Sequence, residues 1–285
     1  MAELIMKGAP VVAAMKEKMT EQVEALKAKG VEPCLTIIRV GARPDDLAYE
    51  RGARKRMESV GIKLAVAELP EDVSQNLLEQ TFYKLNEDPN VHGIMLFRPL
   101  PKHLSDEFAV HDIDPRKDVD CMGIVNTARV FTCDPDCHAP CTAQAVMEML
   151  DFYGVDLTGR NVTVVGRSMV VGKPLAMMLQ KKNATVTMCH TRTRDLGEEC
   201  RRASVVCAAA GKAGMITGDM IAEGAYVADV GINVNKEGKL CGDVDYESVS
   251  PKAGAISPVP GGVGGITSAV LAKHVIRAAE MITGE

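Results

Sequence analysis

Short apolar runs alternate along the first half of the chain with amphipathic stretches. Each run is short enough for a buried strand, and CLTIIRV is the clearest of them. The stretches between repeat their apolar residues at helical spacing, and the first of these stops at Gly30. The predicted strands cover residues 34–40, 63–69 and 93–97, and the predicted helices cover residues 11–29, 45–60 and 75–85. This alternation predicts a parallel sheet covered by helices on both faces.

Residues 112–142 interrupt the alternation with a segment rich in Asp, Pro and Cys, which indicates a long functional loop or a hinge. Beyond it the pattern resumes, with strands at 161–165, 185–189, 204–208 and 226–230 and helices at 171–181 and 267–281. We therefore predict an α/β fold of two lobes that join near residues 120–145. The predicted domains are residues 1–140, residues 141–266, and a C-terminal helix, 267–285, that packs back on the first domain.

The segment NVTVVGRSMVVGKPLAMML has the order strand, glycine turn, helix. Gly166 stands where the strand must turn, and Gly172 opens the helix, as needed where a backbone approaches a pyrophosphate. The spacing departs from G-x-G-x-x-G because Ser168 takes the middle position. A dinucleotide site is predicted here, and an ordinary strand-to-helix turn is the alternative.

The following strand ends in Cys189-His190-Thr191-Arg192, without the acidic residue that holds the ribose of NAD. Arg167, Thr191 and Arg192 are suited instead to a ribose phosphate, which favours NADP, with NAD left open. Further on, Pro258 and Pro260 precede Gly261, Gly262, Gly264 and Gly265. Such a loop suits a backbone that lies against a flat ligand, and a surface loop is the alternative.

Composition narrows the remaining possibilities. The net charge of -5, the absence of Trp and an aromatic content of 4% argue against nucleic acid as a partner. No apolar run approaches the roughly 20 residues that span a bilayer, and the start lacks the apolar core of a signal peptide. A cytoplasmic protein without a membrane partner is expected.

The nine cysteines are scattered, which suits thiols in a reducing compartment better than a disulfide framework. Cys133, Cys137, His138 and Cys141 form the one cluster, and their spacing matches no common zinc pattern. No metal is predicted.

Several segments resemble one known family in order and spacing: PCTAQAVMEML, VDLTGRNVTVVGRSMVVGKPLAMML, NATVTMCHTRT, ADVGIN, GDVDY and SPVPGGVGGITSAVL. They look like the methylenetetrahydrofolate dehydrogenase/cyclohydrolase (FolD) family. The resemblance implies a catalytic lobe and a Rossmann-type lobe with the active site in the cleft between them, and usually a homodimer. It implies oxidation of methylenetetrahydrofolate to methenyltetrahydrofolate with NADP, followed in most members by hydrolysis to formyltetrahydrofolate.

The resemblance also implies roles for individual residues. Gly166, Arg167 and Ser168 would contact the cofactor, with Thr191 near the ribose phosphate and Ile232 beside the nicotinamide half. Asp120 would grip the pterin ring and Tyr49 would be the site tyrosine, which makes these two the catalytic candidates. The remaining predicted substrate contacts are Phe97, Pro258, Gly261 and Gly262.

Two positions depart from the family pattern. The family's Lys, four residues after the tyrosine, is Ala53 here, and its Gln at the end of a strand is Phe97. Hydride transfer needs no side-chain base, whereas hydrolysis calls for proton transfer. We therefore expect the dehydrogenase to survive and the cyclohydrolase to be weak or absent. One alternative is a bifunctional enzyme in which Arg98 or Arg56 takes over; another is a protein that binds folate or dinucleotide without turnover.

Overall fold

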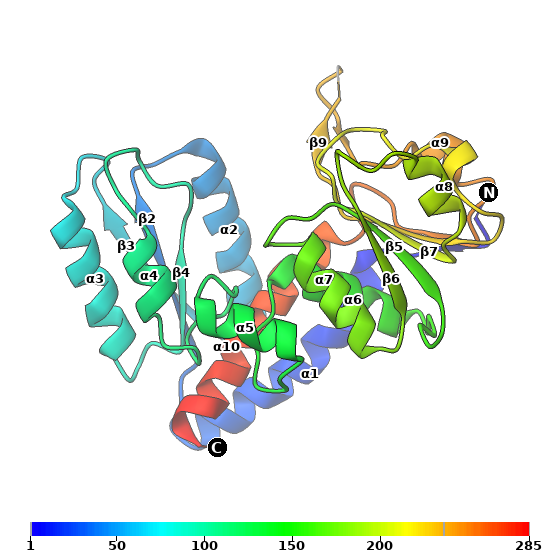
Figure 1. The fold of residues 1–285 in the computed structure, drawn as a ribbon. Helices are drawn as coiled ribbons and strands as arrows, with labels where there is room; N and C mark the ends of the chain where they lie inside the picture. The colour runs from blue at the N-terminus through cyan, green and yellow to red at the C-terminus, as the bar shows by residue number, and fades with distance from the viewer. Residues whose placement is uncertain (1, 236, 285) are drawn as a thin grey trace. The chain divides into compact units, whose positions relative to one another are not determined.

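The computed structural model describes residues 2–235 and 237–284, which form two compact units (Figure 1). The first, here the three-stranded unit, comprises Ala14–Cys141 and the residues from Ser268 onward. The second, here the six-stranded unit, comprises the residues up to Ala13 and Thr142–Thr267. The predicted α/β class is confirmed, and each unit is built on a parallel sheet.

The three-stranded unit has the strand order β3-β2-β4, all parallel. Its strands are β2 (Cys34–Val40), β3 (Lys63–Leu69) and β4 (Gly93–Leu96), and its helices are α2 (Pro44–Glu58), α3 (Gln75–Glu87), α4 (Glu107–Asp112) and α5 (Ile124–Thr132), joined by most of α1 (Gly8–Ala28) and α10 (Gly264–Thr283). Every residue of β2 is buried, as expected for a central strand covered on both faces.

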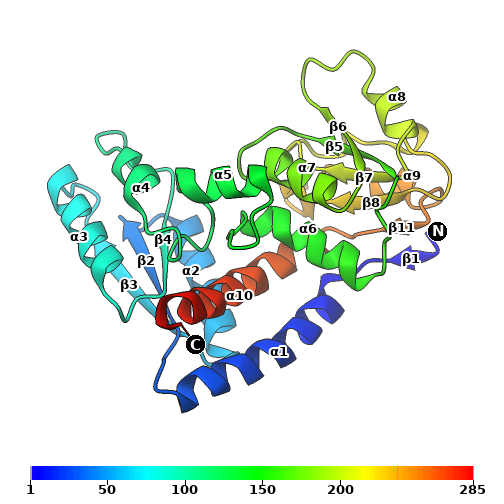
Figure 2. The ribbon, with the colours of Figure 1, turned by 60° about the horizontal axis from the view of Figure 1, so that its bottom comes forward.

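Helices cover both faces of this sheet. On one face Leu78 and Phe82 of α3 and Ala109 of α4 join strand residues in a buried apolar cluster. On the other face α1 and α10 lie side by side (Figure 1, Figure 2), and Gln22 donates a hydrogen bond to Glu280 over 3.2 Å. A Cβ added at Gly93 would meet Val275 of α10 at 3.1 Å, so α10 packs directly on β4.

The six-stranded unit has the strand order β1-β11-β8-β7-β5-β6. Its strands are β1 (Leu4–Ile5), β5 (Asn161–Val165), β6 (Thr185–Cys189), β7 (Val205–Ala208), β8 (Tyr226–Asp229) and β11 (Ala255–Ile256), with a small antiparallel pair of β9 (Asn233–Val234) and β10 (Leu240–Cys241). Its helical segments are α6 (Cys141–Phe152), α7 (Gly172–Lys181), α8 (Leu196–Arg201), η1 (Gly218–Met220) and α9 (Tyr246–Val249).

The chain changes direction across this sheet at β5. It runs from β5 to β6 on one side and then returns to β7 on the other side of β5. In open parallel sheets such a reversal leaves a crevice outside the carboxyl ends of the strands, and ligands bind there. The residues that follow β5, β6 and β7 are therefore candidates for a ligand-binding site.

Several boundaries differ from those predicted. Residues 1–13 were placed in the first domain, but β1 pairs with β11, so the described part of this segment belongs to the six-stranded unit. The segment 112–142, predicted to be a loop or hinge, contains the helix α5. Strands of two residues, such as β1 and β11, were missed because two residues are too few to establish an alternating pattern.

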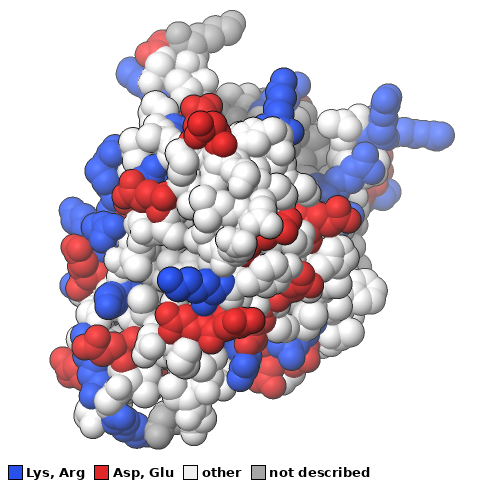
Figure 3. All heavy atoms as spheres, turned by 90° about the vertical axis from the view of Figure 1, so that its left-hand side faces the viewer, with Lys and Arg blue, Asp and Glu red and all other residues white. Residues whose placement is uncertain are grey.

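The surface agrees with the modest net charge. On the face drawn in Figure 3, acidic and basic side chains are interspersed, and no extended basic area is seen. No helix among the residues described has the length and apolar character needed to cross a membrane.

Candidate functional site

The turn after β5 requires glycine at two places. Gly166 has a φ of 134°, and a Cβ there would meet the carbonyl oxygen of Ala209 at 2.2 Å. A Cβ at Gly172 would meet the carbonyl oxygen of Gly166 at 2.2 Å. The start of α7 therefore lies directly against the turn, as in a Rossmann unit, where the backbone must come close to a pyrophosphate.

Ser168 explains why the middle position of this turn is not a glycine. Its Oγ accepts hydrogen bonds from the N–H groups of Val171, at 3.0 Å, and Gly172, at 3.4 Å. A serine in this role satisfies N–H groups at the start of α7 that have no partner within the helix. Arg167 and Ser168 are both exposed, so the turn presents polar side chains to solvent.

The ends of β5 and β6 lie next to each other, because Val165 pairs with Cys189. This register brings Thr191 and Arg192, both exposed, to the same sheet edge as the glycine turn. Within residues 2–235 and 237–284, no carboxylate lies within ion-pair distance of Arg167 or Arg192. Two guanidinium groups without an ion-pair partner in the described part of the chain, at the end of a parallel sheet, fit an anionic group such as a ribose phosphate.

The first acid after β6 cannot replace the missing ribose carboxylate. Asp195 caps α8, where its Oδ1 accepts the N–H of Glu198 at 2.8 Å. Its carboxylate therefore serves as the N-cap of α8.

A cavity of about 170 Å³ in the six-stranded unit brings several predicted residues together. Ile232, which is 65% exposed, lines it together with Pro258, Gly261 and Gly262. The wall is thus an apolar side chain and a glycine-rich backbone, which suits a flat ring.

Two buried carboxylates, which the sequence analysis did not single out, hold the loops around this cavity. Asp243 accepts the N–H groups of Ala210, Gly211 and Lys212 after β7. Asp229 accepts those of Gly231 and Asp243, and burial raises its pKa to about 6 despite these bonds. The GDVDY motif contained Asp243, but a motif alone does not reveal which backbone groups a carboxylate will meet.

In the three-stranded unit, Tyr49 and Phe97 form an aromatic pair. Their ring centroids are 5.5 Å apart at an interplanar angle of 87°, an edge-to-face contact. Tyr49 lies in the second turn of α2, which follows the carboxyl end of β2, and Phe97 directly follows β4. The two positions that depart from the family pattern are buried, since Ala53 is 3% and Phe97 8% exposed. They form an apolar wall beside Tyr49.

Asp120 lies at the same edge of this sheet. Ile94 of β4 forms a parallel bridge with Asp118, so Asp120 is level with the end of β4, next to Phe97. Its Oδ1 accepts the N–H of Cys141 at 3.0 Å. Burial raises the pKa of Asp120, whereas the hydrogen bonds from Cys141 and the positive charge of Arg98 lower it. The carboxylate is therefore held without a salt bridge among the described residues.

Burial also raises the pKa of the Tyr49 hydroxyl, and the negative charge of the nearby Asp120 adds to the rise. The hydroxyl thus lies near Asp120 and remains protonated at neutral pH. The structure brings Tyr49, Phe97 and Asp120 together in one unit, whereas Pro258, Gly261 and Gly262, also predicted to contact substrate, line the cavity of the other unit.

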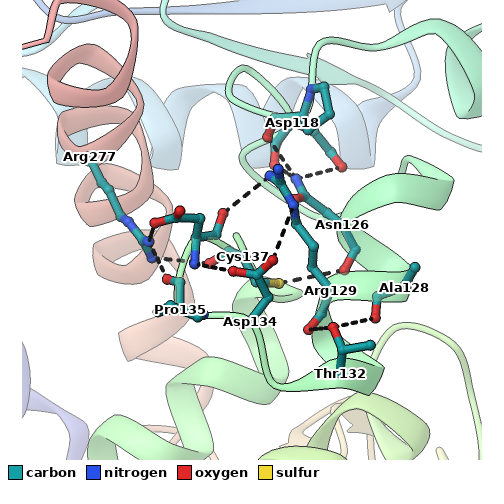
Figure 4. Close-up of polar contacts among 11 residues, drawn as sticks. Asp118, Asn126, Ala128, Arg129, Thr132, Asp134, Pro135, Cys137 and Arg277 are labelled. Atoms are coloured by element: carbon teal, nitrogen blue, oxygen red, sulfur yellow. Dashed lines mark hydrogen bonds and ion pairs between the residues drawn. The ribbon is translucent and has the colours of Figure 1, made fainter.

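The segment that carries Asp120 is fixed by Asp118 (Figure 4). The Asp118 carboxylate accepts the N–H groups of Met122 at 2.8 Å and Gly123 at 3.0 Å, at the start of α5. It also accepts a hydrogen bond from Asn126 Nδ2 at 3.1 Å. Burial raises the pKa of Asp118 to about 6, although these bonds oppose the rise.

Two cysteines of the cluster, Cys137 and Cys141, form hydrogen bonds that hold the surrounding segments together. Cys141 supplies the N–H that binds Asp120, and its Sγ donates to Val119 O at 3.4 Å. Cys137 Sγ donates to Asn126 O at 3.5 Å, and Arg277 of α10 donates to Cys137 O at 3.1 Å (Figure 4). All nine cysteines remain thiols, and no group of His, Cys, Asp and Glu suited to a metal ion occurs in the described part of the chain.

A parallel sheet with a glycine turn at its reversal point, and unpaired cations at the ends of adjacent strands, defines a Rossmann-type dinucleotide-binding α/β protein. Comparisons with known proteins identify the family. Residues 6–120 match the catalytic domain of tetrahydrofolate dehydrogenase/cyclohydrolase, and residues 140–283 match its NAD(P)-binding domain.

The chain belongs to the tetrahydrofolate dehydrogenase/cyclohydrolase family, as the sequence motifs predicted. It is 50% identical over 275 residues to the bifunctional protein FolD of Clostridium kluyveri, covering 96% of this chain and 97% of the relative. The bifunctional FolD structure from Campylobacter jejuni has a TM-score of 0.94 and 39% identity, covering 97% of this chain and 98% of its own. The FolD structure from Trypanosoma brucei, complexed with NADP and an inhibitor, has a TM-score of 0.92 and 35% identity over 100% of both chains.

A first prediction concerns the glycine turn. Gly166→Ala forces a Cβ into the carbonyl of Ala209 and a side chain into a left-handed backbone, so the turn must shift. We expect the dissociation constant for NADP, measured by calorimetry, to rise at least tenfold, which corresponds to about 1.4 kcal/mol. Gly52→Ala, which meets nothing within 4 Å, is the control and should bind normally. Equal affinity of the two variants would contradict this account of the turn.

A second prediction concerns Asp118, whose folded pKa of about 6 exceeds the ordinary value near 4. Between these values the folded protein binds more protons than the unfolded chain, so raising the pH from 4 to 7 lowers the unfolding free energy. Asp118→Asn removes this dependence, and the wild type should lose on the order of 2 kcal/mol relative to the variant over that range. Urea unfolding followed by circular dichroism measures it. Parallel pH curves for the two proteins would refute it.

Proposed function

We propose that this chain oxidises methylenetetrahydrofolate to methenyltetrahydrofolate with NADP. The main support is which positions of the family pattern this chain keeps and which it replaces. The chain keeps Asp120, Tyr49 and the turn from Gly166 to Ser168, with hydrogen bonds that hold Asp120 and the turn in place. The family match extends over both domains. The replaced positions, Ala53 and Phe97, are ones that hydride transfer does not need.

The three-stranded unit supplies the folate contacts in this proposal. The Asp120 carboxylate, which is partly exposed, accepts two N–H groups from the aminopyrimidine edge of the pterin. Tyr49, 42% exposed, offers a ring face or edge to the substrate, and the buried Phe97 fixes its orientation through the edge-to-face contact. Since binding two N–H donors favours the charged form, folate binding lowers the pKa that burial has raised.

NADP, when bound, supplies the acceptor for a hydride that leaves the methylene carbon with two electrons. As the hydride leaves, the lone pair of a neighbouring folate nitrogen forms a second bond to the electron-deficient carbon, which gives the methenyl cation. No proton therefore has to be transferred to a side chain. The task of this chain is therefore to bind and orient the two rings. Tyr49 and Asp120 orient the folate, and Ile232 with the glycine-rich backbone offers an apolar surface to the nicotinamide half.

The choice of NADP over NAD rests on charge. The sheet edge where an acid would bind the ribose hydroxyls of NAD carries Arg167, Thr191 and Arg192 instead. The two arginines lack a carboxylate partner among the described residues. A phosphate would be bound by charge-assisted hydrogen bonds there. The Trypanosoma brucei relative, complexed with NADP, supports the same choice.

The second candidate function is hydrolysis of methenyltetrahydrofolate to formyltetrahydrofolate. The relatives from Clostridium kluyveri and Campylobacter jejuni are both named bifunctional, which favours this activity here. The comparisons thus give no support to the loss of hydrolysis predicted from Ala53 and Phe97. If the activity is retained, it operates without a lysine at position 53. The homodimer, the cytoplasmic location and the absence of a nucleic-acid partner stay predictions.

Asp120→Asn tests the folate contact. Asparagine keeps one oxygen acceptor but presents an NH₂ group to the second N–H donor, so a charged bond is lost and two donors face each other. We expect kcat/KM for methylenetetrahydrofolate, followed as NADPH formation, to fall by about 100-fold, which corresponds to about 2.7 kcal/mol, with an unchanged Kd for NADP. Asp151→Asn, an exposed carboxylate of the other unit, is the control. A fall below threefold would rule out the proposed role of Asp120.

The hydrolytic activity is tested by following loss of methenyltetrahydrofolate against a buffer blank. The bifunctional relatives predict a rate above the blank for the wild type. Restoring the polar pair in Ala53→Lys with Phe97→Gln should raise that rate at least tenfold, because it supplies a group for proton transfer. A wild-type rate equal to the blank, with normal NADPH formation, would show instead a dehydrogenase of single function.

A further inference from the structure

Helix α2 presents one face with three informative positions. Tyr49, Ala53 and Arg56 are spaced by four and then three residues, so they lie on the same side of the helix. Side chains on a helix lean toward its N-terminus and cover the preceding turn. For Arg56 that turn is the one that holds Ala53, whose methyl group leaves room above it. The side chain of Arg56 therefore starts on the same face of the helix as Tyr49.

Arg56 differs from the neighbouring cations of α2 in its surroundings. It is partly buried, and its Nε donates a hydrogen bond to Ser268 Oγ of α10 at 3.2 Å. No carboxylate of the described residues lies within ion-pair distance of it, and no described residue hydrogen-bonds its Nη atoms. In contrast, Arg54 donates to Leu64 O and pairs with Glu50.

This arrangement leaves a partly buried cation without a counter-charge among residues 2–235 and 237–284. Burial lowers the pKa of Arg56, and no charge of these residues offsets that effect. A partly buried cation with unpaired donors is costly, and a ligand that supplies an acceptor reduces that cost. The bond to Ser268 fixes Nε and leaves the Nη groups, with four N–H donors, for that acceptor.

We propose that Arg56 is a substrate-binding residue whose guanidinium donates to an oxygen of the folate that lies against Tyr49. The acceptor chemistry is a carboxylate or carbonyl oxygen, to which the planar guanidinium can donate two parallel bonds. The folate carries such oxygens at three places: the glutamate carboxylates, the carbonyl of the p-aminobenzoyl group and the carbonyl of the pterin ring. The inference rests on the proposed folate substrate and assigns a contact of that same site.

The test compares wild type, Arg56→Ala, Arg56→Lys and the control Arg51→Ala, which removes an exposed cation from the same helix. Two quantities are measured: the KM for methylenetetrahydrofolate at saturating NADP, and the Kd for tetrahydrofolate by calorimetry. The Kd for NADP and the melting temperature report whether each variant is folded. Tetrahydropteroate, which lacks the glutamate, is the second binding probe.

Loss of a charged hydrogen bond predicts that Arg56→Ala raises KM and the Kd for tetrahydrofolate about tenfold or more, with Arg56→Lys between it and wild type. The Kd for NADP should change less than twofold, a selectivity that a misfolded variant would not show. If the effect vanishes with tetrahydropteroate, the partner is the glutamate; if it persists, the partner is the pterin or the benzoyl carbonyl.

A change for Arg56→Ala no larger than that for Arg51→Ala would overturn the proposal. Failure of the proposed dehydrogenase function can be distinguished from failure of the Arg56 proposal, because the first is seen in the wild type itself and the second only in the comparison of variants. A wild type that binds tetrahydrofolate without forming NADPH refutes the dehydrogenase but leaves the Arg56 binding comparison decisive. A wild type that does not bind tetrahydrofolate refutes both.

Discussion

Buried carboxylates that collect backbone N–H groups hold the functional loops of both units. A loop after a parallel strand has N–H groups outside the sheet ladder, and each buried one needs an acceptor. Asp118 accepts those at the start of α5, and Asp243 accepts three successive ones after β7. Asp120 accepts the N–H of Cys141. The orientation of the site residues depends on these bonds, because the loops contain little regular structure of their own.

The same constraint separates what the sequence could predict from what it could not. Strands such as β2, β3, β5 and β6 were predicted with their observed bounds, because five to seven apolar or alternating residues give a clear pattern. The glycine turn at Gly166 was predicted from the need of a backbone to approach a pyrophosphate. The structure shows that turn, and it also requires glycine there because the Ala209 carbonyl lies close to Gly166. The hydrogen-bond partners of Asp118, Asp229 and Asp243 were not predicted from the sequence. Each of these bonds joins groups that come close together only in the folded chain.

The departures from the family pattern acquire a physical meaning in the three-stranded unit. Ala53 and Phe97 are buried apolar residues, and Tyr49 and Phe97 form an edge-to-face aromatic contact. The remaining cation on this face of α2 is Arg56, held by Ser268 rather than by a carboxylate. A guanidinium is a poor proton donor at neutral pH but a strong binding group. In the proposed function, the substitutions bear on hydrolysis and on substrate binding more than on hydride transfer.

In the proposed function, this chain transfers a hydride from the folate methylene carbon to NADP. The most direct measurement uses methylenetetrahydrofolate with deuterium on that carbon in a single turnover with excess enzyme and NADP. The account predicts one equivalent of NADPH per folate, with deuterium found on the nicotinamide ring and a rate slower than with the protiated substrate. NADPH without deuterium, or no NADPH from a wild type that binds both ligands, would contradict it.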